Sequence, residues 1–145
     1  MGQLNFHTTK ASNPPPLSNS IDLPIVTKLG ESYKLWHGFL THLPRLTRYT
    51  LGAKIDNVFT DCLELALLAG YAPRQDKLLL TQRLSTKVDS LKFFLKLLWE
   101  LKALDTNKYA LLSSPVAEIG KMVGGWLNLL KKQTPPLGNG GEKLL

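Results

Sequence analysis

The sequence has few cysteines and no long apolar runs, features on which several common protein classes depend. Its 145 residues include one cysteine, Cys62, so no disulfide can form within the chain and a four-cysteine zinc site is excluded. No run of about 18 uncharged apolar residues occurs, and the sequence therefore predicts no transmembrane helix. The first residues also lack the apolar segment of a secretion signal. These absences predict a cytoplasmic protein that does not enter a membrane.

The residue patterns of common catalytic sites are also missing. His37 and His42 are five residues apart, whereas metal ligands on one helix face are three or four apart. The sequence contains no phosphate-binding glycine loop, paired-cysteine motif or zinc-protease motif. Cys62 falls on an apolar stripe, which favours a buried thiol over a nucleophile. We therefore expect no catalytic residues, no metal site and no cofactor.

What is present is an ordinary globular composition with an excess of positive charge. Hydrophobic residues make up 43% of the chain and charged residues 20%, which excludes a wholly disordered protein. Eighteen Lys and Arg residues against eleven Asp and Glu residues give a net charge of +7. This excess suggests nucleic acid, acidic proteins or anionic lipid as partners.

Proline and glycine divide the chain into three parts. A proline triplet lies in a Ser- and Asn-rich head, and a proline pair opens a Gly-rich tail. We expect a flexible head at 1–20, one domain at 21–133 and a flexible tail at 134–145. Gly70 is expected to cap a helix. Four prolines within the domain are expected to mark helix starts or turns: Pro24, Pro44, Pro73 and Pro115.

Apolar residues recur every three or four positions in four segments, which predicts four amphipathic helices. The first three are expected at about 24–43, 45–69 and 74–104. The fourth ends near Lys132 and begins either at Asp105 or at Ser114, with a helical turn or a kink over 108–112. Four such helices with short connections predict an all-α fold, an antiparallel up-and-down four-helix bundle.

Two features of these segments leave alternatives open. The third carries a second apolar stripe, which is either part of a wide core-facing side or a subunit interface. Its members are Phe94, Leu97, Leu101 and Leu104. The fourth holds Gly120 and Gly124 on one face, and we expect close packing against another helix there.

The basic residues also allow two interpretations. Arg45 and Arg48 lie at a helix start, where positive charge is unfavourable, so they either bind a partner or pair with an acidic group of a neighbouring helix or subunit. The third segment carries Lys87, Lys92 and Lys96. Solvated lysines on a helix face are common, but repetition in an oligomer would strengthen binding to a polyanion.

Beyond these patterns, residues 23–132 resemble a known family. Two elements carry the resemblance most specifically: P-R-x-x-R-x-x-L-G, which starts at Pro44, and E-I-G-K-M-x-G-G-W, which starts at Glu118. The chain resembles the Avd family, the accessory variability determinants of diversity-generating retroelements. That family is related to four-helix-bundle proteins encoded in intervening sequences of ribosomal RNA genes.

The resemblance implies a homopentameric barrel that binds a reverse transcriptase and RNA or DNA. Such a protein supports mutagenic cDNA synthesis without a catalytic centre of its own. Lys92, Lys96 and Lys121 fall where the family has Arg or Lys, and Arg45 and Arg48 fall on the first specific element. The alternative is a scaffold protein of the intervening-sequence type with no reverse-transcriptase role, because a shared fold does not fix function.

Overall fold

The computed structural model describes residues 24–133, and these residues are helical, with no β-strand among them. The predicted all-α class is therefore confirmed for this part of the chain. The helices are α2 (Pro24–Leu40), α3 (Arg45–Tyr49), α4 (Leu51–Tyr71), α5 (Arg74–Glu100) and α6 (Thr106–Gln133). The head and tail expected at 1–20 and 134–145 lie outside the described residues.

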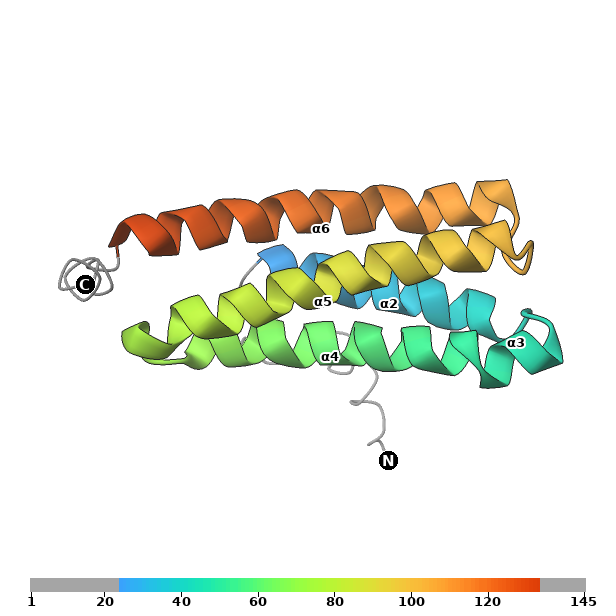
Figure 1. The fold of residues 1–145 in the computed structure, drawn as a ribbon, viewed down its shortest axis with the longest axis horizontal. Helices are drawn as coiled ribbons and strands as arrows, with labels where there is room; N and C mark the ends of the chain where they lie inside the picture. Colours follow the sequence, from blue (N-terminus) through green and yellow to red (C-terminus); the bar gives the residue numbers. More distant parts are fainter. Residues whose placement is uncertain (1–23, 134–145) are drawn as a thin grey trace, which may run out of the picture.

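The four long helices pack side by side as a bundle. Helix α4 packs on α5, α5 on α6, and α2 on both α4 and α6. The α4–α5 connection lies at one end of the bundle, and the α5–α6 connection lies at the other end together with α3 (Figure 1). Each long helix therefore turns one side towards the shared interior.

That interior is filled by the apolar stripes. All five residues of the main α5 stripe are buried: Leu84, Val88, Leu91, Leu95 and Leu98. Trp36 of α2 and Phe59 of α4 are fully buried and stack with their ring centres 6.2 Å apart. Burial of a large apolar side chain contributes about 1.5–3 kcal/mol to the stability of the fold.

A carboxylate at the edge of this core joins α2 to α4. Asp56 Oδ1 accepts hydrogen bonds from Tyr33 Oη at 2.9 Å and from Trp36 Nε1 at 3.1 Å. Both donors thereby keep a partner when they leave water, as buried polar groups require. Burial raises the pKa of the Tyr33 phenol, and the hydrogen bond to Asp56 and its charge raise it further.

The first two segments differ from the prediction: the first helix ends earlier, and the second segment, which begins at Arg45 as predicted, is divided into two helices. Helix α2 stops at Leu40 rather than near Leu43, although Leu43 is buried as expected. Leu43 precedes Pro44, and a residue before proline is disfavoured in helical geometry. The second segment is divided into α3 and α4 at Thr50, whose φ of −111° and ψ of −94° are not helical.

Gly52 explains how the chain tolerates this division. A Cβ atom at this position would lie 3.0 Å from the carbonyl oxygen of Thr47 and 3.2 Å from side-chain carbons of Leu40 and Leu43. Only glycine fits there without displacing a backbone oxygen. The spacing between Pro44 and Gly52 in the first specific element is therefore accounted for by a tight α3–α4 corner.

Gly70 is not the cap predicted for this helix. It is buried inside α4, which ends at Tyr71. Ala72 then adopts extended geometry, with φ of −66° and ψ of 151°, directly before Pro73. The proline, not the glycine, stops the helix.

Helix α5 ends at Glu100, four residues before the predicted end. Lys102 adopts a left-handed φ of 63°. The backbone N–H of Lys102 donates to Trp99 O at 2.8 Å, and that of Ala103 donates to Leu98 O at 3.2 Å. These two bonds form a Schellman motif, in which glycine normally holds the position that Lys102 occupies here. Because position 102 is a lysine and not a glycine, this helix end could not be predicted from the sequence.

Helix α6 begins at the earlier of the two predicted starts. Asp105 Oδ1 accepts a hydrogen bond from the backbone N–H of Lys108 at 2.8 Å, as a capping residue does. Pro115 lies inside the helix, so its prediction as a helix start or turn is wrong. Of the helical turn or kink predicted over 108–112, the helical alternative is found, because α6 runs through these residues without a break.

The glycines of α6 do not bring two helix backbones together. No atom would lie within 4 Å of a Cβ at Gly124 or Gly125, beyond their immediate chain surroundings. At Gly120 the close atom is Lys92 Nζ, 3.2 Å from such a Cβ. The predicted close packing against another helix is therefore found at Gly120, which faces the side chains of Val88 and Lys92 of α5, but it is wrong for Gly124.

Candidate functional site

Lys92 lies where α5 packs against α6. Its ammonium occupies the space that a side chain at Gly120 would take. Lys92 also lines a hollow of about 290 Å³ whose polar wall comes from α6, namely Tyr109, Ser113 and Ser114. An ammonium beside three hydroxyl groups offers several hydrogen-bond donors to a phosphate oxygen.

Lys96 follows one turn later on the same side of α5. Both lysines are well exposed, with 44% of the Lys92 side chain and 59% of the Lys96 side chain open to solvent. Each faces a carboxylate of its own helix: Lys92 Nζ is 3.6 Å from Asp89 Oδ1, and Lys96 Nζ is 4.0 Å from Glu100 Oε2. Exposed pairs of this kind contribute only about 0.3–0.5 kcal/mol, so a phosphate can replace the carboxylate at little cost.

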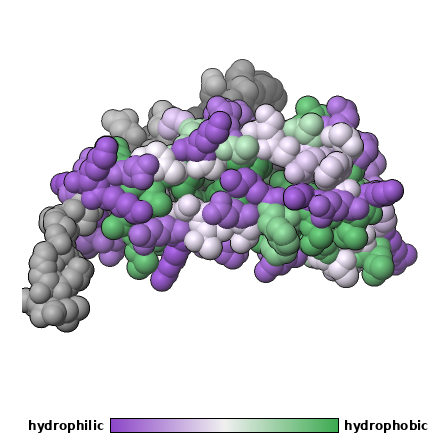
Figure 2. All heavy atoms as spheres, turned by 45° about the horizontal axis from the view of Figure 1, so that its top comes forward, coloured by the Kyte–Doolittle hydropathy of each residue, from purple (hydrophilic) through white to green (hydrophobic). Residues whose placement is uncertain are grey.

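Lys121 adds a third positive charge on α6, directly after Gly120. It is exposed and makes no ion pair with any of the residues between 24 and 133. Glu118, three residues earlier, instead pairs with Lys28 of α2 at 3.5 Å. We call Lys92 and Lys96 of α5, together with Lys121 on the adjacent helix α6, the α5–α6 basic face. With the upper side of the bundle turned forward, Figure 2 shows hydrophilic side chains along its length with hydrophobic ones between them.

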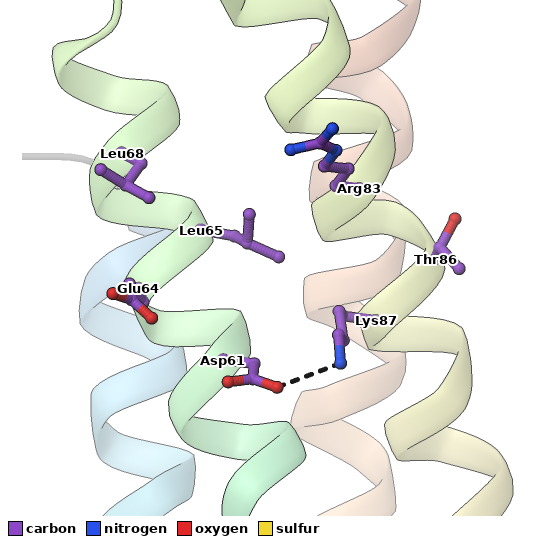
Figure 3. A pocket seen from close by; sticks show the side chains of 7 residues that line it. All are labelled: Asp61, Glu64, Leu65, Leu68, Arg83, Thr86 and Lys87. Carbon is purple, nitrogen blue, oxygen red and sulfur yellow. Dashed lines mark hydrogen bonds and ion pairs between the residues drawn. The ribbon is translucent and has the colours of Figure 1, made fainter.

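Lys87 does not belong to this face. It lies about 140° round α5 from Lys92, at 100° per residue. Lys87 Nζ is 3.0 Å from Asp61 Oδ2, in an ion pair that crosses from α5 to α4. The pair borders a groove of about 440 Å³ that also holds Leu65, Leu68 and Arg83 (Figure 3). The structure therefore separates Lys87 from the other predicted lysines and gives it a partner within the bundle.

Arg45 and Arg48 lie in the short helix α3. Arg48 Nη2 donates to the backbone oxygen of Leu43 at 3.1 Å, which holds the turn between α2 and α3. Arg45 is exposed. Neither arginine pairs with a carboxylate in the described part of the chain, so the predicted pairing with an acidic group is not found there. Arg48 has a structural contact, but its acceptor is a carbonyl group.

The four predicted interface residues have different environments. Leu104 is 2% exposed and belongs to the core of the bundle, so its prediction as an interface residue is wrong. Phe94 is half-buried against that core, and Leu97 is also half-buried. Leu101 is 61% exposed, and Phe93, Leu46 and Tyr49 are also exposed apolar side chains. The second stripe therefore serves the core in part and leaves apolar surface on α5.

Sequence reasoning missed the α6 residues around Lys92 and the partner of Lys87. Tyr109, Ser113 and Ser114 precede Pro115, and the later start, predicted at Ser114, would leave Tyr109 and Ser113 outside the helix. A continuous helix would have placed Tyr109 and Ser113 four residues apart on one face. Asp61 and Lys87 belong to different segments, and nothing in the spacing of either segment reveals their contact.

The side chains of Cys62 and His42 make contacts within the fold. Cys62 is fully buried, and burial raises the pKa of its thiol to about 12, so the thiolate nucleophile is scarce at neutral pH. His42 Nδ1, in the turn after α2, lies 3.1 Å from the carbonyl oxygen of Gly38 in that helix. Between residues 24 and 133, no three His, Cys, Asp or Glu side chains gather in a way that could hold a metal ion.

None of the helices in the described region combines the length and apolar character needed to cross a membrane. Comparison with known proteins gives no relative: no protein-family model, curated protein or solved structure matches the chain.

Proposed function

We propose that this protein is a non-catalytic accessory subunit of the Avd type, which binds a reverse transcriptase of a diversity-generating retroelement together with nucleic acid. The proposal combines the resemblance of residues 23–132 to that family with the positive charge of the chain. In this role the protein contributes binding surface to mutagenic cDNA synthesis, and the reverse transcriptase contributes the chemistry.

The observation that carries the nucleic-acid part of the proposal is the α5–α6 basic face. Lys121 has no carboxylate partner among the described residues, and Lys92 and Lys96 have only exposed partners on their own helix. Phosphate contacts by such side chains supply most of the affinity of sequence-independent nucleic-acid binding. Lysine offers a point charge without the bidentate geometry of arginine, which suits backbone contacts better than base recognition.

The proposed assembly is a pentameric barrel of up-and-down four-helix bundles. Exposed apolar side chains on α3 and at the end of α5, Leu46 and the capping residue Leu101 among them, are candidates for the contact between subunits. Five copies would repeat the basic face five times and multiply its phosphate contacts. Sedimentation equilibrium at micromolar concentration should give about five times the 16.1 kDa chain mass, and a mass of 16.1 kDa would exclude the assembly.

The reverse-transcriptase role requires a direct test. The protein should be co-expressed with a reverse transcriptase encoded beside its gene, and the two should co-purify. The purified pair should synthesise cDNA from the retroelement template, whereas the reverse transcriptase alone should synthesise much less. The variant in which Lys92 and Lys96 are both alanine should fold but support less synthesis.

The competing function is a scaffold of the intervening-sequence type. A gene without a neighbouring reverse transcriptase and repeat pair, together with a protein that fails to stimulate cDNA synthesis, would favour the scaffold. Nucleic-acid binding by itself does not separate the two functions, because the basic face would be present in both cases.

A further inference from the structure

Trp99 is held rigidly beside the basic face. Its ring lies 5.1 Å from the ring of Tyr109 between centres, and the two planes are within 11° of parallel. Trp99 Nε1 also donates to Thr106 Oγ1 at 3.1 Å, so the indole is fixed both by stacking and by a hydrogen bond. A side chain that is already ordered loses little entropy when a ligand stacks on it.

The same indole lines a hollow at the α5–α6 corner. This hollow has a volume of about 540 Å³, and we call it the Trp99 hollow. Its other walls come from Glu100, Lys102, Leu104, Asp105 and Thr106. Lys102 reaches the wall from the left-handed backbone position, which glycine would occupy with less strain. An aromatic wall with polar groups around it suits a flat ring that carries hydrogen-bonding edges.

The hollow and the basic face are continuous through Tyr109. Tyr109 stacks on Trp99 and also lines the hollow that contains Lys92. Lys96 lies three residues before Trp99 and therefore on the same side of α5. Lys92 lies seven residues before Trp99, about 10 Å from it along the helix axis. A nucleic-acid strand whose phosphates contact Lys92 and Lys96 would bring its next nucleotide to Trp99.

We propose that the Trp99 hollow takes an unpaired base of single-stranded RNA or DNA whose phosphates lie on the α5–α6 basic face. This inference rests on the proposed function and makes it more specific. Bases stack on aromatic side chains with little regard to sequence, because every base has a π-face. In a duplex the bases are stacked on one another and paired, so none reaches the indole.

The charges around the hollow favour a base over a phosphate inside it, because its two carboxylates, Glu100 and Asp105, outnumber its one ammonium, that of Lys102. Glu100 and Asp105 repel a phosphate but accept hydrogen bonds from the N–H groups of bases, the N3–H of thymine among them. Lys92 and Lys96 attract the phosphates on the other side of Trp99. A single strand satisfies both requirements when its base enters the hollow and its backbone follows α5.

The first experiment uses the unaltered protein at low salt. Binding is measured to oligothymidylate, to an abasic oligonucleotide of the same length, and to a duplex, with RNA and DNA forms of the single strand as separate arms. We expect the strand with bases to bind about 5- to 100-fold more tightly than the abasic strand, as one stacked base predicts. Equal affinity for the two strands would overturn the inference and leave the proposed function intact. No binding to any of them would overturn both.

A second experiment locates the stacked base. Trp99→Leu should reduce the affinity for oligothymidylate to that of the abasic strand and leave duplex binding unchanged. The control is Tyr71→Leu, which removes an aromatic side chain that is 58% exposed at the far end of α4, and it should change neither affinity. If Trp99→Leu and unaltered protein discriminate equally between strands with and without bases, the base does not stack in this hollow. If Trp99→Leu does not fold, equal affinity of the unaltered protein for strands with and without bases still overturns the inference.

Discussion

The ammonium nitrogen of Lys77, in the first turn of α5, lies 2.9 Å from the carbonyl oxygen of Ala69 near the end of α4. The same nitrogen donates to the carbonyl oxygen of Gly70 at 3.0 Å. The last carbonyl groups of a helix have no partner within the helix, and positive charge near them is favourable. Lys77 therefore caps the preceding helix from across the α4–α5 turn.

Replacement of this lysine by methionine tests the cap. Lys77→Met keeps most of the aliphatic stem but removes both hydrogen bonds, so it should lower the free energy of unfolding by about 1–2 kcal/mol. Urea denaturation followed by circular dichroism measures the change. Lys34→Met is the matched control, because Lys34 is exposed and mid-helix, and it should change stability by about 0.5 kcal/mol or less. Equal effects of the two variants would show that Lys77 is not a cap.

Replacement by alanine should change the stability of the protein in opposite directions at Gly52 and at Gly30. A Cβ at Gly52 would press on the carbonyl oxygen of Thr47, so Gly52→Ala should destabilise the protein by about 1–3 kcal/mol. No such neighbour lies within 4 Å at Gly30, where alanine should stabilise α2 by about 0.5–1 kcal/mol. Melting temperatures of both variants check this. A stabilising Gly52→Ala would mean that the α3–α4 corner is not tight.

Alkaline pH should weaken the fold through Cys62. The unfolded thiol loses its proton near its ordinary pKa of 9.0, whereas the folded thiol keeps it up to about 12. The folded state therefore binds more protons in this interval, so the stability present below pH 9.0 is progressively lost as the pH rises towards 12. The raised pKa of Tyr33 acts in the same direction above its ordinary value of 10.0.

Cys62→Ala isolates the thiol contribution. The variant is less stable at neutral pH because it leaves a cavity, but its stability should fall less steeply between pH 9 and 12. One proton accounts for a slope difference of up to about 1.4 kcal/mol per pH unit. Urea unfolding at several pH values gives both slopes. Parallel curves for the two proteins would contradict the burial effect.

The helices could be predicted because their apolar spacing is a local property of the chain. Leu84 to Leu98 form a stripe that faces the core in any bundle. Helix ends were harder where tertiary contacts decide them, as at Gly52, or where an unexpected residue takes a special conformation, as Lys102 does in its Schellman motif. Pro115 led to a wrong prediction, because a proline can also lie inside a helix that packs against neighbouring helices.

The candidate site could be predicted only in part. Lys92 and Lys96 share a face because helical spacing dictates it. The separation of Lys87 follows from the same spacing, but its partner Asp61 belongs to another helix and required the structure. The stack of Trp99 on Tyr109 joins two helices across a turn, and the two rings are ten residues apart in the chain. Sequence spacing within one helix cannot reveal such a contact.

The proposed nucleic-acid binding depends most directly on phosphate contacts by the basic face, and the salt dependence of binding measures these contacts. Labelled RNA and DNA should bind tightly at low salt, and the logarithm of the association constant should fall linearly with the logarithm of salt concentration. Replacing Lys92 and Lys96 together by alanine should reduce this slope by roughly one to two units. Replacing Lys131 and Lys132 instead removes the same charge from the exposed end of α6 and should reduce it less. An unaltered slope in the Lys92 and Lys96 variant, or no binding by the unaltered protein at low salt, would contradict the account.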